Sequence, residues 1–541
     1  MTDYLMRVEA VNFASFIGDT FDLSTVRGAG LLLLNAPDAL SSELHLTKVY
    51  AGASSAIYRF QADGEDQAAR ICRDAEGLLH ADGRSAATIL VVSEAFDDAD
   101  FSGVMNRLQN KIRWRQLQSP SLIYPTLNSA EIDELDDLRP AVKRASRLNP
   151  PEIEGGKGTP MVLSDATFQR RSYGIDQKRC FYASRAWAGA PWASDFPFHT
   201  GEYVNDFNQL ADCPGKGRTN GKIALIYLDG NKFGQIASSC RSPDEVSNWA
   251  NTVQANQNSF LHWLLSLRIA DSPRSGMTSW HWSGRVQTNS GYGQIKNHAF
   301  RIETLLWGGD EIIWIVPAWC GWWVLTNFFD LYGTIPWKEP GVEREFTTDR
   351  KYRLSHGASI VFSHSNAPIH RLIRLAKHLA EEPKRLGTHG LRTENYQDYF
   401  TYQVLESFDH LGDDPEKIRA LRMPYILRTA GADSLTLSGD GMKGVLAGME
   451  KVRSKFPRSK LHRLLDLYCN HPDSAPNEQA EKELKNAGTT DVFTELSDYF
   501  GATAPDEALK NAAAWMHIAE LWDYTPEPDW KACEIGKGVS A

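Results

Sequence analysis

The sequence predicts an α+β protein with two similar sheet domains and a helical C-terminal domain. The order strand, helix, strand, strand, helix, strand can be traced in residues 1–140 and again in residues 221–400. This order is typical of a ferredoxin-like domain. Residues 401–541 show helical patterns only. Residues 141–220 are rich in Gly and Pro, which predicts an irregular linker or insertion.

In the first domain, apolar residues either form short runs or recur at helical spacing. Strands are predicted at residues 7–17, 46–50, 56–60 and 87–92, and helices at 23–34, 66–79 and 101–112. The second domain begins at the apolar run Ile223–Leu228, which turn residues bound on both sides, as expected of a buried strand. Further strands are predicted at 302–307, 312–316 and 358–362, and helices at 246–267, 322–331 and 369–380. The C-terminal domain should contain helices at 444–455, 460–469, 477–485 and 508–521.

Composition limits the classes of protein to consider. A chain of 541 residues is long enough for about three or four domains with cores of their own. The net charge of -10 argues against a protein that coats nucleic acid along its whole length. The seven scattered cysteines form no CxxC pair, so we expect a reducing, cytoplasmic location. Residues 312–329 are uncharged, but Pro317 and Gly321 interrupt them, which favours a strand and a helix over a membrane span.

The strongest chemical signal is a set of carboxylates at the ends of two strands. Asp229 ends the first strand of the second domain, and Asp310 and Glu311 lie in the hairpin between its second and third strands. A ferredoxin-like sheet sets these strands side by side, about 5 Å apart. The carboxylates can therefore share divalent cations such as Mg²⁺ or Mn²⁺, which prefer oxygen ligands. Two such ions commonly activate a hydroxyl and stabilise a leaving pyrophosphate.

Glycines and backbone amides around these acids suggest a nucleotide site. Gly308 and Gly309 permit a tight turn and a close approach of a nucleotide to the backbone. Amides in the segment that follows Asp229 could hold a triphosphate; these residues are Gly230, Asn231, Lys232, Phe233 and Gly234. The alternative is that GGDE is only a hairpin turn, but the Asp-ended strand upstream favours a site.

Three motifs of the second domain, LDGNKFG, WGGDEIIWIVP and LSHGASIVFSHSNAPIHRLIRLAKHLAEEPKR, carry a resemblance to known proteins. They resemble the palm of GGDEF-type nucleotidyl cyclases and, more closely, that of the large polymerase-like subunit of type III CRISPR effector complexes. The family's Asp-Gly-Asp strand end, Gly-Gly-Asp-Asp hairpin, Ser-x-Gly strand and Pro-initiated helix correspond here to Asp229–Asn231, Gly308–Glu311, Ser355–Gly357 and Pro368. The resemblance extends to the first and last domains. DTFDLSTVRGAGLLLL is similar to the family's first-palm helix, and MPYI and FPRSKLHRLL resemble its C-terminal helical domain.

The resemblance implies two palm domains, of which the first is degenerate and the second active. In the first, Asn12 stands where the second has Asp229, and Tyr50–Ser54 contains no carboxylate where the second has its hairpin. An unrelated ferredoxin-like domain is the alternative. In the second, Asn231 and Glu311 each stand where the family has an Asp, so one metal position is expected to bind its ion more weakly or with different properties. The family's HD nuclease domain is not expected, because the chain has no His-Asp dipeptide.

The resemblance also implies a function. The chain is expected to be a metal-dependent nucleotidyltransferase that makes a cyclic oligoadenylate-type messenger from ATP when target RNA is recognised. Ser355, Lys384 and Arg385 are expected to help hold ATP. The implied partners are other subunits of a CRISPR ribonucleoprotein complex, crRNA and target RNA, with no membrane. The alternatives are a stand-alone defence cyclase with another product, and a nucleotide-binding scaffold without turnover.

Two features of the linker stay open. Cys180, Cys213 and His199 lack the paired spacing of a zinc site, so no zinc is expected there. The aromatic segment Trp187–Phe198 is expected to be an irregular loop, with stacking of RNA bases as the alternative.

Overall fold

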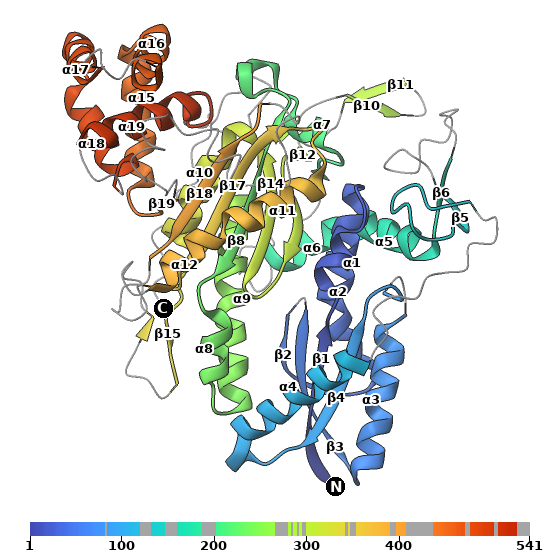
Figure 1. The fold of residues 1–541 in the computed structure, drawn as a ribbon. Helices are drawn as coiled ribbons and strands as arrows, with labels where there is room; N and C mark the ends of the chain where they lie inside the picture. Colours follow the sequence, from blue (N-terminus) through green and yellow to red (C-terminus); the bar gives the residue numbers. More distant parts are fainter. Residues whose placement is uncertain are drawn as a thin grey trace.

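The computed structural model has two sheet domains, the first with an antiparallel sheet and the second with a mixed sheet, and a separate group of C-terminal helices (Figure 1). It describes residues 1–52, 54–81, 84–118, 131–145, 160–186, 202–265, 280–282, 285–288, 291–294, 299–340, 345–346, 353–389, 397–406, 436–470, 476–502 and 507–526. The predictions for Trp187–Phe198, Met423–Ile426 and His199 lie outside these residues. Among the helices described, none combines the length and apolar character needed to cross a bilayer.

The first domain has the predicted order of elements. Its sheet runs β2-β3-β1-β4, with every neighbouring pair antiparallel. The elements are β1 (Thr2–Ala10), α1 (Phe13–Gly18), α2 (Leu23–Glu43), β2 (Thr47–Ala51), β3 (Ser55–Ala62), α3 (Glu65–Leu79), β4 (Ile89–Ala95) and α4 (Phe101–Gln118). The prediction of one strand over residues 7–17 is wrong, because the strand ends at Ala10 and a helix follows. Phe16 and Ile17 are consecutive and both buried, whereas successive strand residues point to opposite faces.

The second sheet repeats this strand order and extends it. Its order is β13-β14-β8-β17-β18-β19, and its first four strands are antiparallel like those of the first sheet. These strands are β8 (Lys222–Gly230), β13 (Glu303–Trp307), β14 (Glu311–Pro317) and β17 (His356–His364), followed by β18 (Tyr399–Val404) and β19 (Thr436–Ser438). Every residue of β8 is buried, as expected of a central strand. The α+β class is confirmed, but the prediction of helices alone after residue 401 is wrong, because β18 and β19 complete this sheet.

Helices cover both faces of the second sheet. On one face, α9 (Pro243–Leu265) and α10 (Ala318–Leu331) bury Phe260 and Trp322 against the even-numbered residues of β8. On the other face, α11 (Ile369–Leu379) and the long α2 of the first domain share a core with Leu225 and Tyr227. The uncharged segment 312–329 therefore forms β14 and most of α10, as predicted.

Residues 141–220 are more ordered than the sequence predicted. They contain α5 (Asp165–Asp176), α6 (Lys178–Ala186) and α7 (Phe207–Ala211). The face of α5 that packs on α2 includes Arg170, Arg171 and Gly174. Hydrophobic periodicity misses this helix because its buried face is largely polar.

The C-terminal part contains the four predicted helices and one more. The predicted helices correspond to α15 (Met442–Lys455), α16 (Arg458–Asn470), α17 (Pro476–Ala487) and α19 (Glu507–Leu521), each of which begins within two residues of the expected start. The sequence did not predict α18 (Thr490–Phe500).

Gly28 of α2 provides a test of this packing. A Cβ at Gly28 would lie 1.8 Å from the backbone oxygen of Arg170 in α5, which cannot move without shifting that helix. We expect Gly28→Ala to lower the free energy of unfolding by about 2–3 kcal/mol in urea titrations, as overpacked sites do. Gly77→Ala in α3 is the control, since nothing lies within 4 Å of its Cβ position and alanine favours a helix. Equal stability of the two variants would contradict the close packing.

Candidate active site

The structure brings the predicted carboxylates together at one end of the second sheet. Asp229 at the end of β8 lies directly opposite Glu311 at the start of β14. The backbone N–H of Gly230 donates to the carbonyl oxygen of Asp310 at 2.8 Å, which ties the hairpin to the end of β8. Asp229 is buried, Glu311 is partly exposed and Asp310 is exposed. The site is therefore an acidic rim that solvent reaches from one side.

One tyrosine and two lysines contact these acids. The hydroxyl of Tyr227 donates to Glu311 Oε1 at 2.7 Å and approaches Asp229 Oδ2 at 3.3 Å. Lys384 Nζ lies 2.7 Å from Asp229 Oδ2, and Lys377 Nζ lies 3.3 Å from Glu311 Oε2. Each of these two carboxylates thus has one lysine and shares one tyrosine.

Burial and neighbouring negative charge raise the pKa of the two aspartates. The pKa of Asp229 is raised, chiefly because burial removes water from its carboxyl; Asp310 and Glu311 add to the rise, while Lys384 opposes it. The pKa of Asp310 is also raised, first by loss of water around its carboxyl and then by the charge of Glu311. Since Asp310 is exposed at the hairpin tip, solvent limits its shift. A positive charge delivered to this rim would stabilise the ionised acids.

The donor set fits a hard divalent cation. Asp229 Oδ1 is buried and has no hydrogen-bond partner. Among the described residues, no three His, Cys, Asp or Glu side chains meet in a ready-made metal cluster. Lys384 and Lys377 instead occupy oxygens of Asp229 and Glu311. Carboxylate oxygens of Asp229, Asp310 and Glu311 are ligands of the kind that Mg²⁺ or Mn²⁺ prefers.

A glycine explains how Lys384 reaches Asp229. Helix α12 (Glu381–His389) passes so close to β17 that a Cβ on Gly357 would lie 2.5 Å from the backbone nitrogen of Lys384. Gly357 also pairs with Asp229 in the sheet. Without a side chain at Gly357, α12 can rest on the strand end and direct Lys384 to the acid. Arg385, predicted to act beside Lys384, is exposed and lies 3.7 Å from Glu382 of its own helix.

Asn231 is fixed by contacts that favour an amide. Its Nδ2 donates to Ser355 Oγ at 2.9 Å, and its backbone N–H donates to the carbonyl oxygen of Ser355 at 2.9 Å. A Cβ on Gly387 would lie 2.3 Å from the same Nδ2, so α12 packs directly on this amide. Asn231 Oδ1 is buried without a hydrogen-bond partner. Asn231 therefore ties the end of β8 to Ser355 and packs under α12, and its Oδ1 is left without a donor.

The other predicted nucleotide-binding residues serve as supports or lie at the surface. Lys232 adopts a left-handed conformation (φ 59°) just before the short α8 (Phe233–Ser239). Phe233 is buried against Trp249 and His356, so its side chain acts in packing. Gly234 is exposed beside it.

The hairpin turn is held by hydrogen bonds within its own domain and lies close to the first domain. Gly308 N–H donates to the carbonyl oxygen of Glu311 at 2.7 Å. Gln257 of α9 donates its Nε2 to the carbonyl oxygens of Gly308 at 2.8 Å and Gly309 at 3.2 Å. A Cβ on Gly309 would lie 3.8 Å from the hydroxyl of Tyr50 in β2. The first domain therefore faces the acidic rim directly.

Three neighbours of the acids were not found from the sequence: Tyr227, Lys377 and Gln257. Tyr227 lies two positions before Asp229, and the period of two in a strand places both on one side. Lys377, which lies on the helix before Lys384, contacts Glu311 and is therefore unsuitable as a control for Lys384. In the first domain, Asn12 accepts from Thr88 N–H at 2.6 Å and donates to the carbonyl oxygen of Ala86, so this residue holds a loop.

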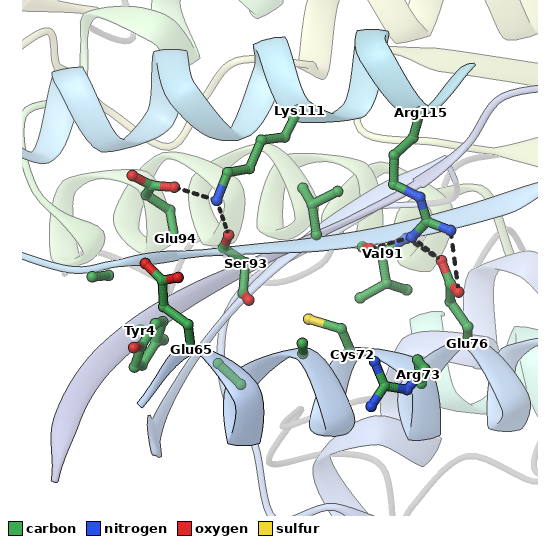
Figure 2. A pocket seen from close by; sticks show the side chains of 14 residues that line it. Tyr4, Glu65, Cys72, Arg73, Glu76, Val91, Ser93, Glu94, Lys111 and Arg115 are labelled. Carbon is green, nitrogen blue, oxygen red and sulfur yellow. Dashed lines mark hydrogen bonds and ion pairs between the residues drawn. The ribbon is translucent and has the colours of Figure 1, made fainter. Parts of the chain in front are cut away.

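A groove of about 520 Å³ lies elsewhere, between α3 and α4 along the outer edge of β4 (Figure 2). Its charged groups satisfy one another and the strand edge. Arg115 donates to Glu76 and to the carbonyl oxygen of Val91, and Lys111 donates to the carbonyl oxygen of Ser93. Charged side chains commonly protect an edge strand in this way. The groove is therefore a structural feature of the first domain.

Comparison with known proteins identifies the class of fold. No family model matches the chain, and no curated protein matches it in sequence. The crystal structure of Csm1 in T. onnurineus is similar over 96% of this chain and 69% of that chain, with 13% identity and a TM-score of 0.50. The Csm1-Csm4 cassette in complex with one ATP covers 97% of this chain and 70% of that one (12% identity, TM-score 0.49), and the cassette with cA3 covers 96% and 70% (13% identity, TM-score 0.48).

The similarity to Csm1, at a TM-score of 0.50, shows a fold rather than an activity, because the identity is low. The class is a protein with two sheet domains, one antiparallel and one mixed, and a helical C-terminal part. Within that class, the chain has the fold of Csm1, and the resemblance drawn from its sequence motifs is confirmed at the level of the fold.

Competition between Lys384 and a metal gives a test that needs no turnover. Lys384 places a positive charge beside Asp229. Two unit charges about 4 Å apart in water repel by about 1 kcal/mol, and a divalent ion at that separation would be repelled by at least as much. We expect Lys384→Ala to bind Mn²⁺ about fivefold more tightly than the unmodified chain in nucleotide-free titrations followed by electron paramagnetic resonance. Lys451→Ala on α15, an exposed lysine in another domain, should leave the affinity unchanged. Weaker Mn²⁺ binding by Lys384→Ala would contradict this interpretation.

Proposed function

We propose that this chain is the nucleotidyl cyclase-like subunit of a type III CRISPR complex. In this proposal it joins ATP molecules into a cyclic oligoadenylate-type messenger when the complex recognises target RNA. The observation that supports it best is the meeting of Asp229 and Glu311, with Asp310 beside them, at the end of a sheet whose fold is that of Csm1. The two sheet domains would be the degenerate and the active palm of that family.

The reaction follows from the chemistry of ATP. The 3′-hydroxyl of one nucleotide attacks the α-phosphorus of another; the new P–O bond forms as the bond to pyrophosphate breaks, and the hydroxyl proton leaves to solvent. Negative charge accumulates on the leaving pyrophosphate. Lys384 stands where it could turn from Asp229 to that charge, because its amine is half-exposed. Divalent ions held by Asp229, Asp310 and Glu311 would neutralise the phosphates when bound.

A second function is favoured by Asn231. Its amide is committed to Ser355 and packed under Gly387, so it supplies no carboxylate to a metal. A palm with one metal ligand fewer could bind nucleotide as a scaffold without turnover. The two functions differ in whether product forms, and both expect the same partners: other CRISPR subunits, crRNA and target RNA.

Product formed by the unmodified complex distinguishes the cyclase from the scaffold, and removal of either aspartate tests the site. Because each supplies carboxylate oxygens at the rim, Asp229→Ala and Asp310→Ala should each reduce cyclic product by at least about a hundredfold, as loss of a transition-state electrostatic group does. Product is measured by mass spectrometry after the assembled complex is incubated with ATP, Mn²⁺ and target RNA. Asp74→Ala, an exposed aspartate of α3, is the control and should keep full activity. Full activity in Asp310→Ala would contradict the assignment of the site.

Lys384 should act on the triphosphate. We expect Lys384→Ala to raise the KM for ATP or to lower kcat by about tenfold, since a point charge on the phosphates is lost. Steady-state kinetics with the assembled complex measure this, with Lys451→Ala as the control in place of Lys377. If both variants behave like the unmodified protein, Lys384 has no role in holding ATP.

A further inference from the structure

The solvent face of α11 carries one sign of charge. Residues 369–380 contain no Asp or Glu, although the whole chain has a net charge of -10. The buried face of the helix is apolar, with Leu372 and Leu375 in the core. Apart from the partly exposed Ile373, the remaining positions are basic and exposed or partly exposed: His370, Arg371, Arg374, Lys377 and His378. We call this set the α11 basic face.

The α11 basic face runs away from the acidic rim. Lys377 near its end reaches Glu311, and its amine lies 5.4 Å from the centre of the Tyr227 ring. His370 near its start meets the ring of Phe21 edge-on, with ring centres 4.6 Å apart. These two ends are about 10 Å apart along the helix axis. In Figure 1, α11 lies across the second sheet on the side of α1 and α2.

The aromatic ring of Phe21 lies at the His370 end of the α11 basic face. Its ring is 56% exposed, although most large apolar side chains of this domain are buried. Exposed aromatic rings beside a row of positive charges are typical of surfaces that bind single-stranded nucleic acid, where bases stack on the rings and phosphates lie along the charges. The ordinary alternative is a solvated helix face, which would be indifferent to nucleic acid.

We propose that the α11 basic face, with Phe21 at its far end, binds the phosphates and a base of the short oligonucleotide on which the acidic rim acts. Arg371 and Arg374 hold the phosphates outside the catalytic carboxylates, and Phe21 stacks on a base. This inference rests on the proposed function, because it names the oligonucleotide that occupies the same site between successive additions of nucleotides.

Direct binding tests the inference without turnover. The probe is a fluorescent linear oligoadenylate of four nucleotides, titrated against the full-length chain in EDTA at several salt concentrations. The double variant Arg371→Ala/Arg374→Ala should bind at least about fivefold more weakly at low salt. For this variant, the slope of the logarithm of the binding constant against the logarithm of the salt concentration should be shallower by about 1.4. Each phosphate contact on a single strand contributes about 0.7 to that slope. Phe21→Ala should also weaken binding about fivefold, with no change in salt dependence.

The matched control is Arg70→Ala/Arg73→Ala on α3. These two arginines are exposed and have the same spacing, but they lie in the first domain away from the rim. Equal binding of the short probe by the two double variants overturns the inference. A second probe is a mixed-sequence RNA of forty nucleotides. If Arg371→Ala/Arg374→Ala weakens binding of this long RNA only, the face binds a long RNA and the inference is also overturned.

The outcome is separable from that of the proposed function. If arginine-dependent binding of the short probe is found while the complex makes no cyclic product, the binding face stands and the cyclase function fails. If product forms normally and the Arg371→Ala/Arg374→Ala variant binds and elongates like the unmodified protein, the cyclase function stands and this inference fails.

Discussion

The close approach of α2 to two other elements is the constraint on which the rest of the structure depends. A Cβ at Gly28 would lie 1.8 Å from the backbone oxygen of Arg170, and one at Gly30 would lie 2.8 Å from that of Leu305 in β13. Both contacts are with backbone, so no rotation of a side chain can relieve them. Glycine at these two positions lets one helix of the first domain lie against α5 and the edge of the second sheet. That contact fixes which face of the first domain meets the acidic rim.

Buried charges make the same junction specific. Glu303 of β13 accepts from Arg27 of α2 at 2.6 Å and from Lys178 of α6 at 2.7 Å, and all three side chains are almost fully buried. Removing charges from water is costly, so such a cluster stabilises only the arrangement in which every partner is present. Burial lowers the pKa of Lys178 to about 8, while the charge of Glu303 opposes that shift. The cluster therefore links α2, α6 and the strand that leads into the GGDE hairpin.

The acidic rim shows a second use of compensating charge. Asp229 and Glu311 are adjacent across β8 and β14, where their mutual repulsion and partial burial are unfavourable. Lys384 and Lys377 relieve this while leaving Asp229 Oδ1 without a partner. The two lysines therefore offset the repulsion between the acids without occupying every carboxylate oxygen.

The sequence by itself determined the elements with strong periodicity and the acids at their ends. The apolar runs of β8 and β14 located Asp229 and Glu311 at adjoining strand ends, because the expected strand order of a βαββαβ domain places these two strands side by side. It did not determine α5, whose buried face carries Arg170 and Arg171, or β18 and β19, which are strands only because β17 offers an open edge. The tertiary structure alone decided that Lys377 and Lys384 reach the acids. Their contacts depend on how closely α11 and α12 pack on the sheet, and that distance is set by glycines and buried side chains far apart in the chain.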